Sequence, residues 1–138
     1  MFRLRFRSVF AAFAVAALSA CGDDDPTLPT TPTPAPITET FSGTVNPNGA
    51  ATHTFTATTA GAVQVTLTAL GPDSSVISGL ALGEWNGTGC AERIANDTAV
   101  QTTVILGTVS QAGQLCVRVR DVGRFVSSVT YEVTVVHP

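Results

Sequence analysis

The feature that most constrains the fold of this chain is an alternation of apolar and polar residues that begins after residue 38. In residues 62–69, valine, leucine and alanine point to one side of an extended backbone, and glutamine and threonine point to the other. The same alternation recurs in residues 52–57, 115–120 and 129–136. A period of two with many β-branched residues is typical of a strand buried on one face. The pattern predicts β-strands, and no segment shows the period of an amphipathic helix.

Four further segments predict strands from a weaker pattern: residues 39–45, 76–85, 92–95 and 102–109. Turn residues separate the strands, and Asn96-Asp97 is one of these turn signals. Eight short strands at nearly regular spacing predict an all-β domain, an antiparallel two-sheet β-sandwich over residues 38–138.

The N-terminal residues have the composition of an export signal. Arg3, Arg5 and Arg7 precede an unbroken apolar run of residues 9–18. A run of this length is too short to cross a bilayer, which requires about 20 residues. We therefore interpret residues 1–20 as a signal peptide. The alternative is a short anchor helix that stays in place.

The signal ends in Leu18-Ser19-Ala20-Cys21, which resembles a bacterial lipobox. The resemblance implies cleavage before Cys21, whose thiol receives a diacylglycerol and whose amino group is acylated, so that the mature protein is held at a membrane. Gly22 stands where an aspartate would favour retention at the inner membrane. The resemblance therefore favours the outer membrane of the bacterial envelope, on its periplasmic or its surface face.

Residues 21–37 predict a disordered tether between this anchor and the sandwich. Five prolines lie among the twelve residues of PTLPTTPTPAPI, a composition that favours extended polyproline II and cannot pack a core. At about 3.1 Å per residue the tether reaches about 50 Å. The three aspartates that precede it are interpreted as solvated rather than as a calcium site.

The charge balance excludes one class of partner. Without the signal peptide, four arginines and no lysine face ten acidic residues, which gives a net charge of −6. Nucleic acids are bound through Lys and Arg that neutralise phosphates. We expect no nucleic-acid partner.

The other two cysteines, Cys90 and Cys116, predict a disulfide. With Cys21 acylated they form an even pair in an oxidising compartment. A metal site is disfavoured, because two isolated cysteines and two distant histidines match none of the usual ligand spacings.

Five segments in order resemble the bacterial pre-peptidase C-terminal domain over about residues 38–138. They are Phe41–Val45, His53–Ala57, Ile94–Asp97, Ala112-Gly113 with Leu115–Val119, and Tyr131–Val135. The resemblance implies a jelly-roll-like sandwich without catalytic residues, which serves as an accessory or binding module. Some members bind calcium, and some bind collagen or polysaccharide. A weak calcium site at Asn96 and Asp97 is therefore a hypothesis, with Glu92, Asp73 or Asp121 as further ligands, and a plain Asn-Asp turn is the alternative.

Candidate contact residues for a ligand are Trp85 and Asn86, at the predicted end of a strand. Trp85 is interpreted as a stacking platform if it is exposed and as a core residue if it is buried. His53 lies on an apolar strand face and is interpreted as a hydrogen-bonded histidine, and Arg118 and Arg120 are expected to pair with Glu132.

The sequence carries none of the common catalytic motifs. Its leading prediction is a non-enzymatic envelope lipoprotein that binds a protein or a glycan and needs no cofactor. The alternative is a structural or accessory envelope component without a soluble ligand. The oligomeric state stays open.

Overall fold

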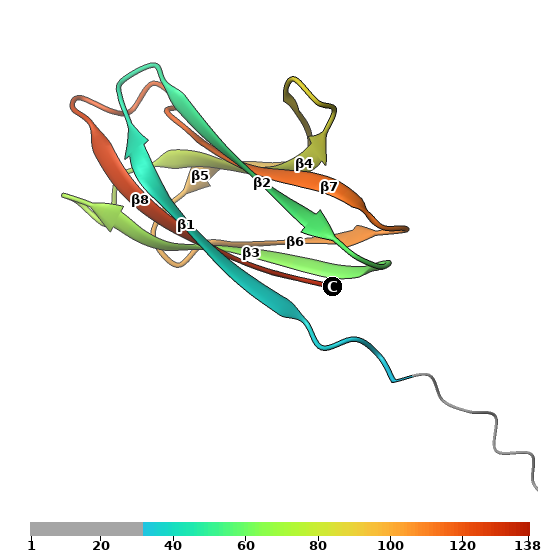
Figure 1. The fold of residues 1–138 in the computed structure, drawn as a ribbon. Coiled ribbons are helices and arrows are strands. Elements are labelled where there is room, and N and C mark those ends of the chain that lie inside the picture. Colours follow the sequence, from blue (N-terminus) through green and yellow to red (C-terminus); the bar gives the residue numbers. More distant parts are fainter. Residues whose placement is uncertain (1–31) are drawn as a thin grey trace, which may run out of the picture. The chain divides into compact units, whose positions relative to one another are not determined.

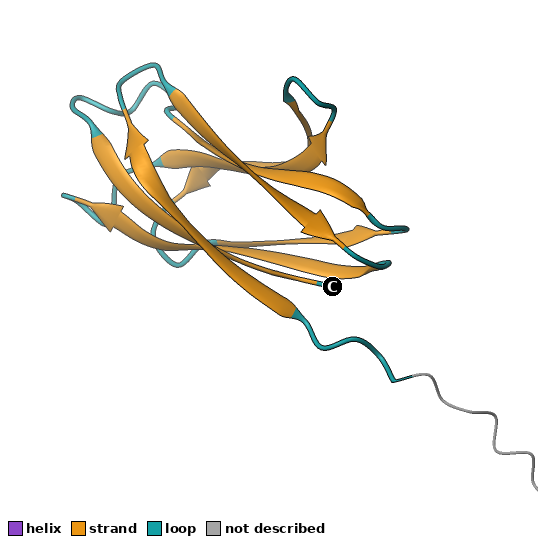
Figure 2. Ribbon diagram, viewed as in Figure 1, coloured by secondary structure: helices purple, strands orange, loops and turns teal. Residues whose placement is uncertain are grey.

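The computed structural model describes residues 32–138, and the regular elements in this range are eight β-strands (Figure 2). The signal peptide, Cys21 and the tether as far as residue 31 lie outside the described residues. The strands are β1 (Ile37–Val45), β2 (Ala50–Ala57), β3 (Gly61–Gly71), β4 (Ser78–Trp85), β5 (Cys90–Ala99), β6 (Val104–Val109), β7 (Gly113–Arg120) and β8 (Val129–His137). Within residues 32–138 we find no helix with the length and apolarity needed to cross a membrane.

The strands form two antiparallel four-stranded sheets that face each other (Figure 1). One sheet has the order β1-β8-β3-β6 and is called sheet A here, and the other has the order β2-β7-β4-β5 and is called sheet B. Every connection except β4 to β5 crosses from one sheet to the other. This order is that of an eight-stranded jelly roll. The predicted all-β antiparallel sandwich with jelly-roll topology is confirmed.

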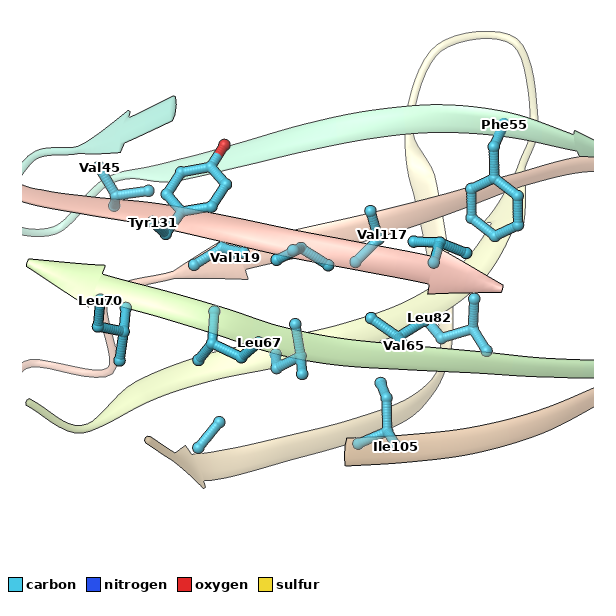
Figure 3. Packing of buried hydrophobic residues seen from close by; sticks show 14 of the residues in the cluster. Val45, Phe55, Val65, Leu67, Leu70, Leu82, Ile105, Val117, Val119 and Tyr131 are labelled. Atoms are coloured by element: carbon cyan, nitrogen blue, oxygen red, sulfur yellow. The ribbon is translucent and has the colours of Figure 1, made fainter. Parts of the chain in front are cut away.

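The core lies between the sheets, where the apolar residues of each alternating strand meet (Figure 3). The apolar face of β3 points inward, and so do the apolar faces of β7 and β8. The largest side chains shielded completely from solvent include Val63, Val65, Leu67, Leu80, Val117, Val119, Val133 and Val135. Burial of these side chains stabilises the fold by about 1.5–3 kcal/mol each.

The burial of strand β4 explains why its residues alternate only weakly between apolar and polar in the sequence. All of its residues from Ser78 to Gly83 are buried, because sheet B is covered on its outer face as well at this strand. A strand that is buried on both faces loses the contrast between apolar and polar positions.

The turn predicted at Asn96-Asp97 is wrong, because both residues lie inside β5. The register between β4 and β5 shifts at this place, between Ser78 and Leu80. The Asn96 side-chain oxygen accepts hydrogen bonds from the backbone N–H and the hydroxyl of Thr98, both at 2.9 Å. The local Asn-Asp geometry is therefore accommodated as an irregularity within a strand.

The loops gather at two opposite ends of the sandwich. Ile37, where β1 begins, pairs with His137 at the end of β8, and the loops 58–60, 86–89 and 110–112 lie at this N-terminal end (Figure 1). The remaining four loops form the opposite end. They are residues 46–49, 72–77, 100–103 and 121–128.

One carboxylate braces two loops of the opposite end. Asp121 accepts backbone N–H bonds from Asn48 at 2.8 Å, Arg124 at 2.7 Å and Phe125 at 3.0 Å. These hydrogen bonds lower the pKa of Asp121 below its usual value. The loop between β1 and β2 is thereby attached to the loop between β7 and β8.

Candidate functional site

Trp85 lies at the N-terminal end of the sandwich, as the last residue of β4. Its side chain is neither fully exposed nor part of the core, but half-buried. Trp85 therefore matches neither interpretation fully, and it is one of the residues that line a groove. An indole in this position combines an apolar face with a polar N–H.

Asn86 follows Trp85 and organises the loop to β5. Its side-chain oxygen accepts bonds from the Thr88 N–H at 3.0 Å, the Thr88 hydroxyl at 3.0 Å and the Gly89 N–H at 2.8 Å. The turn also needs Gly87, whose φ of 96° lies in the left-handed region. The oxygen of Asn86 is thus occupied by its own loop, and the side chain shapes the turn that follows Trp85 rather than offering an acceptor.

A groove of about 290 Å³ runs between the end of β4 and the loop that joins β6 to β7. Its polar side chains come from three elements and include Glu84, Thr108, Ser110, Gln111 and Gln114, and Trp85 forms part of one wall. Apart from Trp85, none of these residues was predicted from the sequence as a ligand contact. Nothing in the sequence places the loop between β6 and β7 beside the end of β4.

A smaller apolar hollow of about 60 Å³ adjoins the groove. Both depressions share Glu84, Thr108, Val109 and Leu115. Glu84 at the shared rim is paired with Arg93 at 3.0 Å, and both side chains are more than half exposed, so the pair is weak. The two depressions therefore form one continuous feature with an apolar part and a polar part.

The disulfide between Cys90 and Cys116, predicted from the sequence, is present. It joins the first residue of β5 to β7, although β4 lies between these strands in the sheet. The disulfide can span β4 because β5 passes close to the outer face of β4 at Gly83. A Cβ atom at Gly83 would lie 2.9 Å from the Glu92 Cα atom and closer still to the Ala91 carbonyl. The disulfide and Gly83 together fix the base of the loop that follows Trp85.

The acidic residues suggested for calcium have other partners. Arg120 binds Glu92 through Nη1 at 2.6 Å and Asp97 through Nη2 at 2.6 Å, and these carboxylates raise the pKa of Arg120. Arg118 also contacts Glu92, at 3.3 Å. The expected pairing of both arginines with Glu132 is wrong, since Glu132 belongs to the opposite sheet.

Asp73 and Asp121, the other suggested ligands, are bound to their own loops. Asp73 accepts bonds from the N–H of Ser75 at 2.8 Å and from its hydroxyl at 2.7 Å. Among residues 32–138 no three His, Cys, Asp or Glu side chains lie close enough together to hold a metal ion. The carboxylates of this region instead link strands and brace turns.

The two histidines connect β1 to its neighbours. His53 stacks on Phe41 with ring centroids 4.9 Å apart, and its Nε2 shares a hydrogen bond of 2.7 Å with the Tyr131 hydroxyl. Burial lowers the pKa of His53 and raises the pKa of Tyr131. His137 is buried and contacts Glu39 on β1 through Nε2 at 2.9 Å. This arrangement agrees with the interpretation of His53 as a hydrogen-bonded histidine.

Comparison of the chain with protein-family models gives no match, and comparison with curated proteins gives none either.

Proposed function

We propose that this protein is a lipid-anchored, non-catalytic binding module of the bacterial cell envelope, and that it takes a glycan in the groove beside Trp85. The lipobox resemblance at Cys21 supports the anchor. The resemblance to the pre-peptidase C-terminal domain supports a binding role rather than a catalytic one. The choice of a glycan over a protein partner follows from the chemistry of the groove.

The observation that carries this proposal is that Trp85, which is half-buried, and the amide residues Gln111 and Gln114 line one groove. A sugar ring presents an apolar C–H face and a rim of hydroxyl groups. The Trp85 ring suits the apolar face. Gln111 and Gln114 each carry two N–H donors and a carbonyl acceptor, which suits hydroxyl groups that both donate and accept.

The groove is also open and small, which limits the size of the ligand. A volume of about 290 Å³ is at the lower end of the range for small-molecule sites, about 300–1,000 Å³. We therefore expect it to hold one or two sugar units of a longer chain. The exposed Glu84 at its rim disfavours an acidic sugar at that position, so neutral or amino sugars are expected.

The chain supplies its own probe for this proposal, because Trp85 is its single tryptophan. A glycan array identifies candidate oligosaccharides, and a fluorescence titration of the full chain with each of them then reports on the groove. We expect binding to change the emission of Trp85 and to saturate.

Two variants separate groove binding from binding elsewhere. Gln111→Ala with Gln114→Ala keeps the probe and removes both amides, so we expect the dissociation constant to rise about tenfold for two lost hydrogen bonds. Gln64→Ala on the outer face of β3 removes an exposed amide that does not line the groove and should leave the titration unchanged. If millimolar oligosaccharides leave the emission of Trp85 unchanged, the alternative of a structural envelope component without a soluble ligand is favoured.

A further inference from the structure

Strand β6 forms one edge of sheet A and pairs with β3 alone. The carbonyl of Thr103, directly before β6, accepts a hydrogen bond of 2.9 Å from the Leu67 N–H on β3. Along an antiparallel strand the backbone groups of successive residues point alternately to the two sides. Ile105 therefore directs its N–H and C=O toward β3, and Val104 and Leu106 direct theirs away from the sheet.

The side chains of this edge are apolar and exposed. Val104 and Leu106 belong to the outer face of sheet A and are 46% and 66% exposed. They stand among the few large apolar side chains exposed in the described part of the chain. The edge of β6 thus offers both unpaired backbone groups and apolar surface.

Two of the other three edge strands carry features that oppose pairing with a further strand. Strand β5 contains charged residues and two register shifts, and β1 contains Glu39. The third, β2, exposes threonines rather than large apolar side chains. Charges and bulges are the usual protection of a sheet edge. Strand β6 has no charge, no proline and no register shift against β3.

We propose that the edge of β6 pairs with β6 of a second copy of this chain and joins two A sheets into one continuous sheet. The pairing is antiparallel, with a two-fold axis beside Ile105. Val104 of each copy then lies opposite Leu106 of the other. The N–H and C=O groups of these two residues bond across the interface, and their apolar side chains are in contact. Closed two-fold pairing of identical surfaces is the commonest form of protein assembly.

Charge favours a second copy at this place. The chain is acidic, and most of its surfaces repel a like copy. The sequence from Thr98 to Val117, which includes all of β6, carries no charged residue. Charge repulsion between two copies therefore does not oppose association along β6.

The interface is small. Six residues of paired strand extend over about 20 Å. A contact of this size is typical of a weak and reversible dimer rather than of an obligate one. The proposal rests on the edge of β6 at residues 104–106, whereas the groove uses the far end of this strand at Thr108 and Val109. The cross-linking and the glycan titration can therefore fail separately.

Disulfide cross-linking tests both the dimer and its register. Full-length Val104→Cys and Leu106→Cys chains, carrying different tags, are produced together and treated with a mild oxidant. The register brings the Cα atoms of Val104 and Leu106 of opposite copies to about 5.5 Å, a separation that a disulfide spans. Two copies of the same variant have their cysteines about 8 Å apart, which is too far.

We expect a cross-linked dimer that carries both tags from the mixture, and little from either variant alone. Thr40→Cys, at the exposed opposite edge of sheet A, measures random collisions. The proposal is overturned if the mixture forms no more dimer than Thr40→Cys, if each variant cross-links with itself as well as with the other, or if the cross-links lead to other proteins instead.

A charge substitution gives a second readout without added cysteines. Leu106→Lys should raise the dimer dissociation constant of the full chain about tenfold in sedimentation experiments, since it removes a leucine that the dimer would bury. Thr40→Lys adds the same charge at the other edge and should leave the dissociation constant unchanged. Equal effects of the two substitutions, or a wild-type chain that stays monomeric at millimolar concentration, would contradict the dimer.

Discussion

At Gly83 the outer face of β4 has room for a hydrogen atom and nothing larger. The β5 backbone at Ala91 and Glu92 occupies the space that a Cβ atom would need. The neighbouring atoms are backbone atoms, which cannot rotate away as the end of a flexible side chain can. The close passage of β5 over β4 at this point also allows Cys90 to reach Cys116.

We expect Gly83→Ala to lower the free energy of unfolding by about 1–3 kcal/mol, the usual cost of overpacking. Urea denaturation followed by circular dichroism measures this change. Gly89→Ala is the matched control, because a Cβ atom at Gly89 meets nothing within 4 Å. Equal stability of the two variants would show that β5 is free to move away from β4.

His53 makes the stability dependent on pH. Burial lowers its pKa in the folded protein, so the unfolded chain binds a proton more readily. The stability due to neutral His53 is fully present above the unfolded pKa of about 6.5 and is lost as pH falls through the lower folded pKa.

Thermal melting between pH 8 and pH 5 tests this dependence. The melting temperature of the wild-type chain should fall below about pH 6.5, whereas His53→Gln should keep the hydrogen bond to Tyr131 and lose this part of the pH dependence. Parallel curves for the two proteins would mean that other groups cause the change.

Among the elements, β5 depends most on a covalent link. It is an edge strand with two register shifts against β4, and these shifts weaken its pairing. The disulfide closes a loop with a sequence separation of 26 and fixes the first residue of β5. The same disulfide fixes the end of the loop that follows Trp85.

Replacing both Cys90 and Cys116 by alanine should lower the free energy of unfolding by about 3.5 kcal/mol, from the chain entropy released in the unfolded state. Urea denaturation of the wild-type and variant chains gives the difference. The Trp85 emission of the folded variant should also shift toward that of a more exposed indole. An unchanged denaturation midpoint would show that β5 is held by its strand pairing alone.

For the whole molecule, the jelly roll separates two sets of loops. The end of β4 lies at the same end of the sandwich as the start of β1 (Figure 1). Trp85 and the groove that it lines belong to this end. The loops braced by Asp121 lie at the other end. In the proposed lipoprotein, the four loops of that opposite end lie farthest along the sandwich from the anchored terminus.

The anchor itself is tested by Cys21→Ser. We expect the wild-type chain to incorporate labelled palmitate and to fractionate with membranes, and the variant to lose both properties while its β-sheet circular dichroism stays unchanged. Two or more acyl chains are needed for stable attachment. A membrane-bound Cys21→Ser chain would show that the protein is held by something other than this cysteine.

The sequence by itself determined the strands, the sandwich and the disulfide. Alternation with a period of two identifies a half-buried strand from local information, and all eight predicted strands are present, with shifted ends. The even cysteine pair in β5 and β7 likewise needed no knowledge of the fold. Two segments departed from the expected pattern for local reasons. Strand β4 is buried on both faces, and Asn96-Asp97 lies at an irregularity inside β5.

The tertiary structure alone decided which side chains meet. Gln111 and Gln114 line the same groove as Trp85 because the jelly roll brings the loop between β6 and β7 to the end of β4. The partner of Arg120 is Glu92 rather than Glu132, because β7 and β8 belong to different sheets. Alternation fixes which face a residue takes, but it contains no information on which strands become neighbours. That choice depends on the packing of the whole core, and it places the groove, the ion pairs and the free edge of β6.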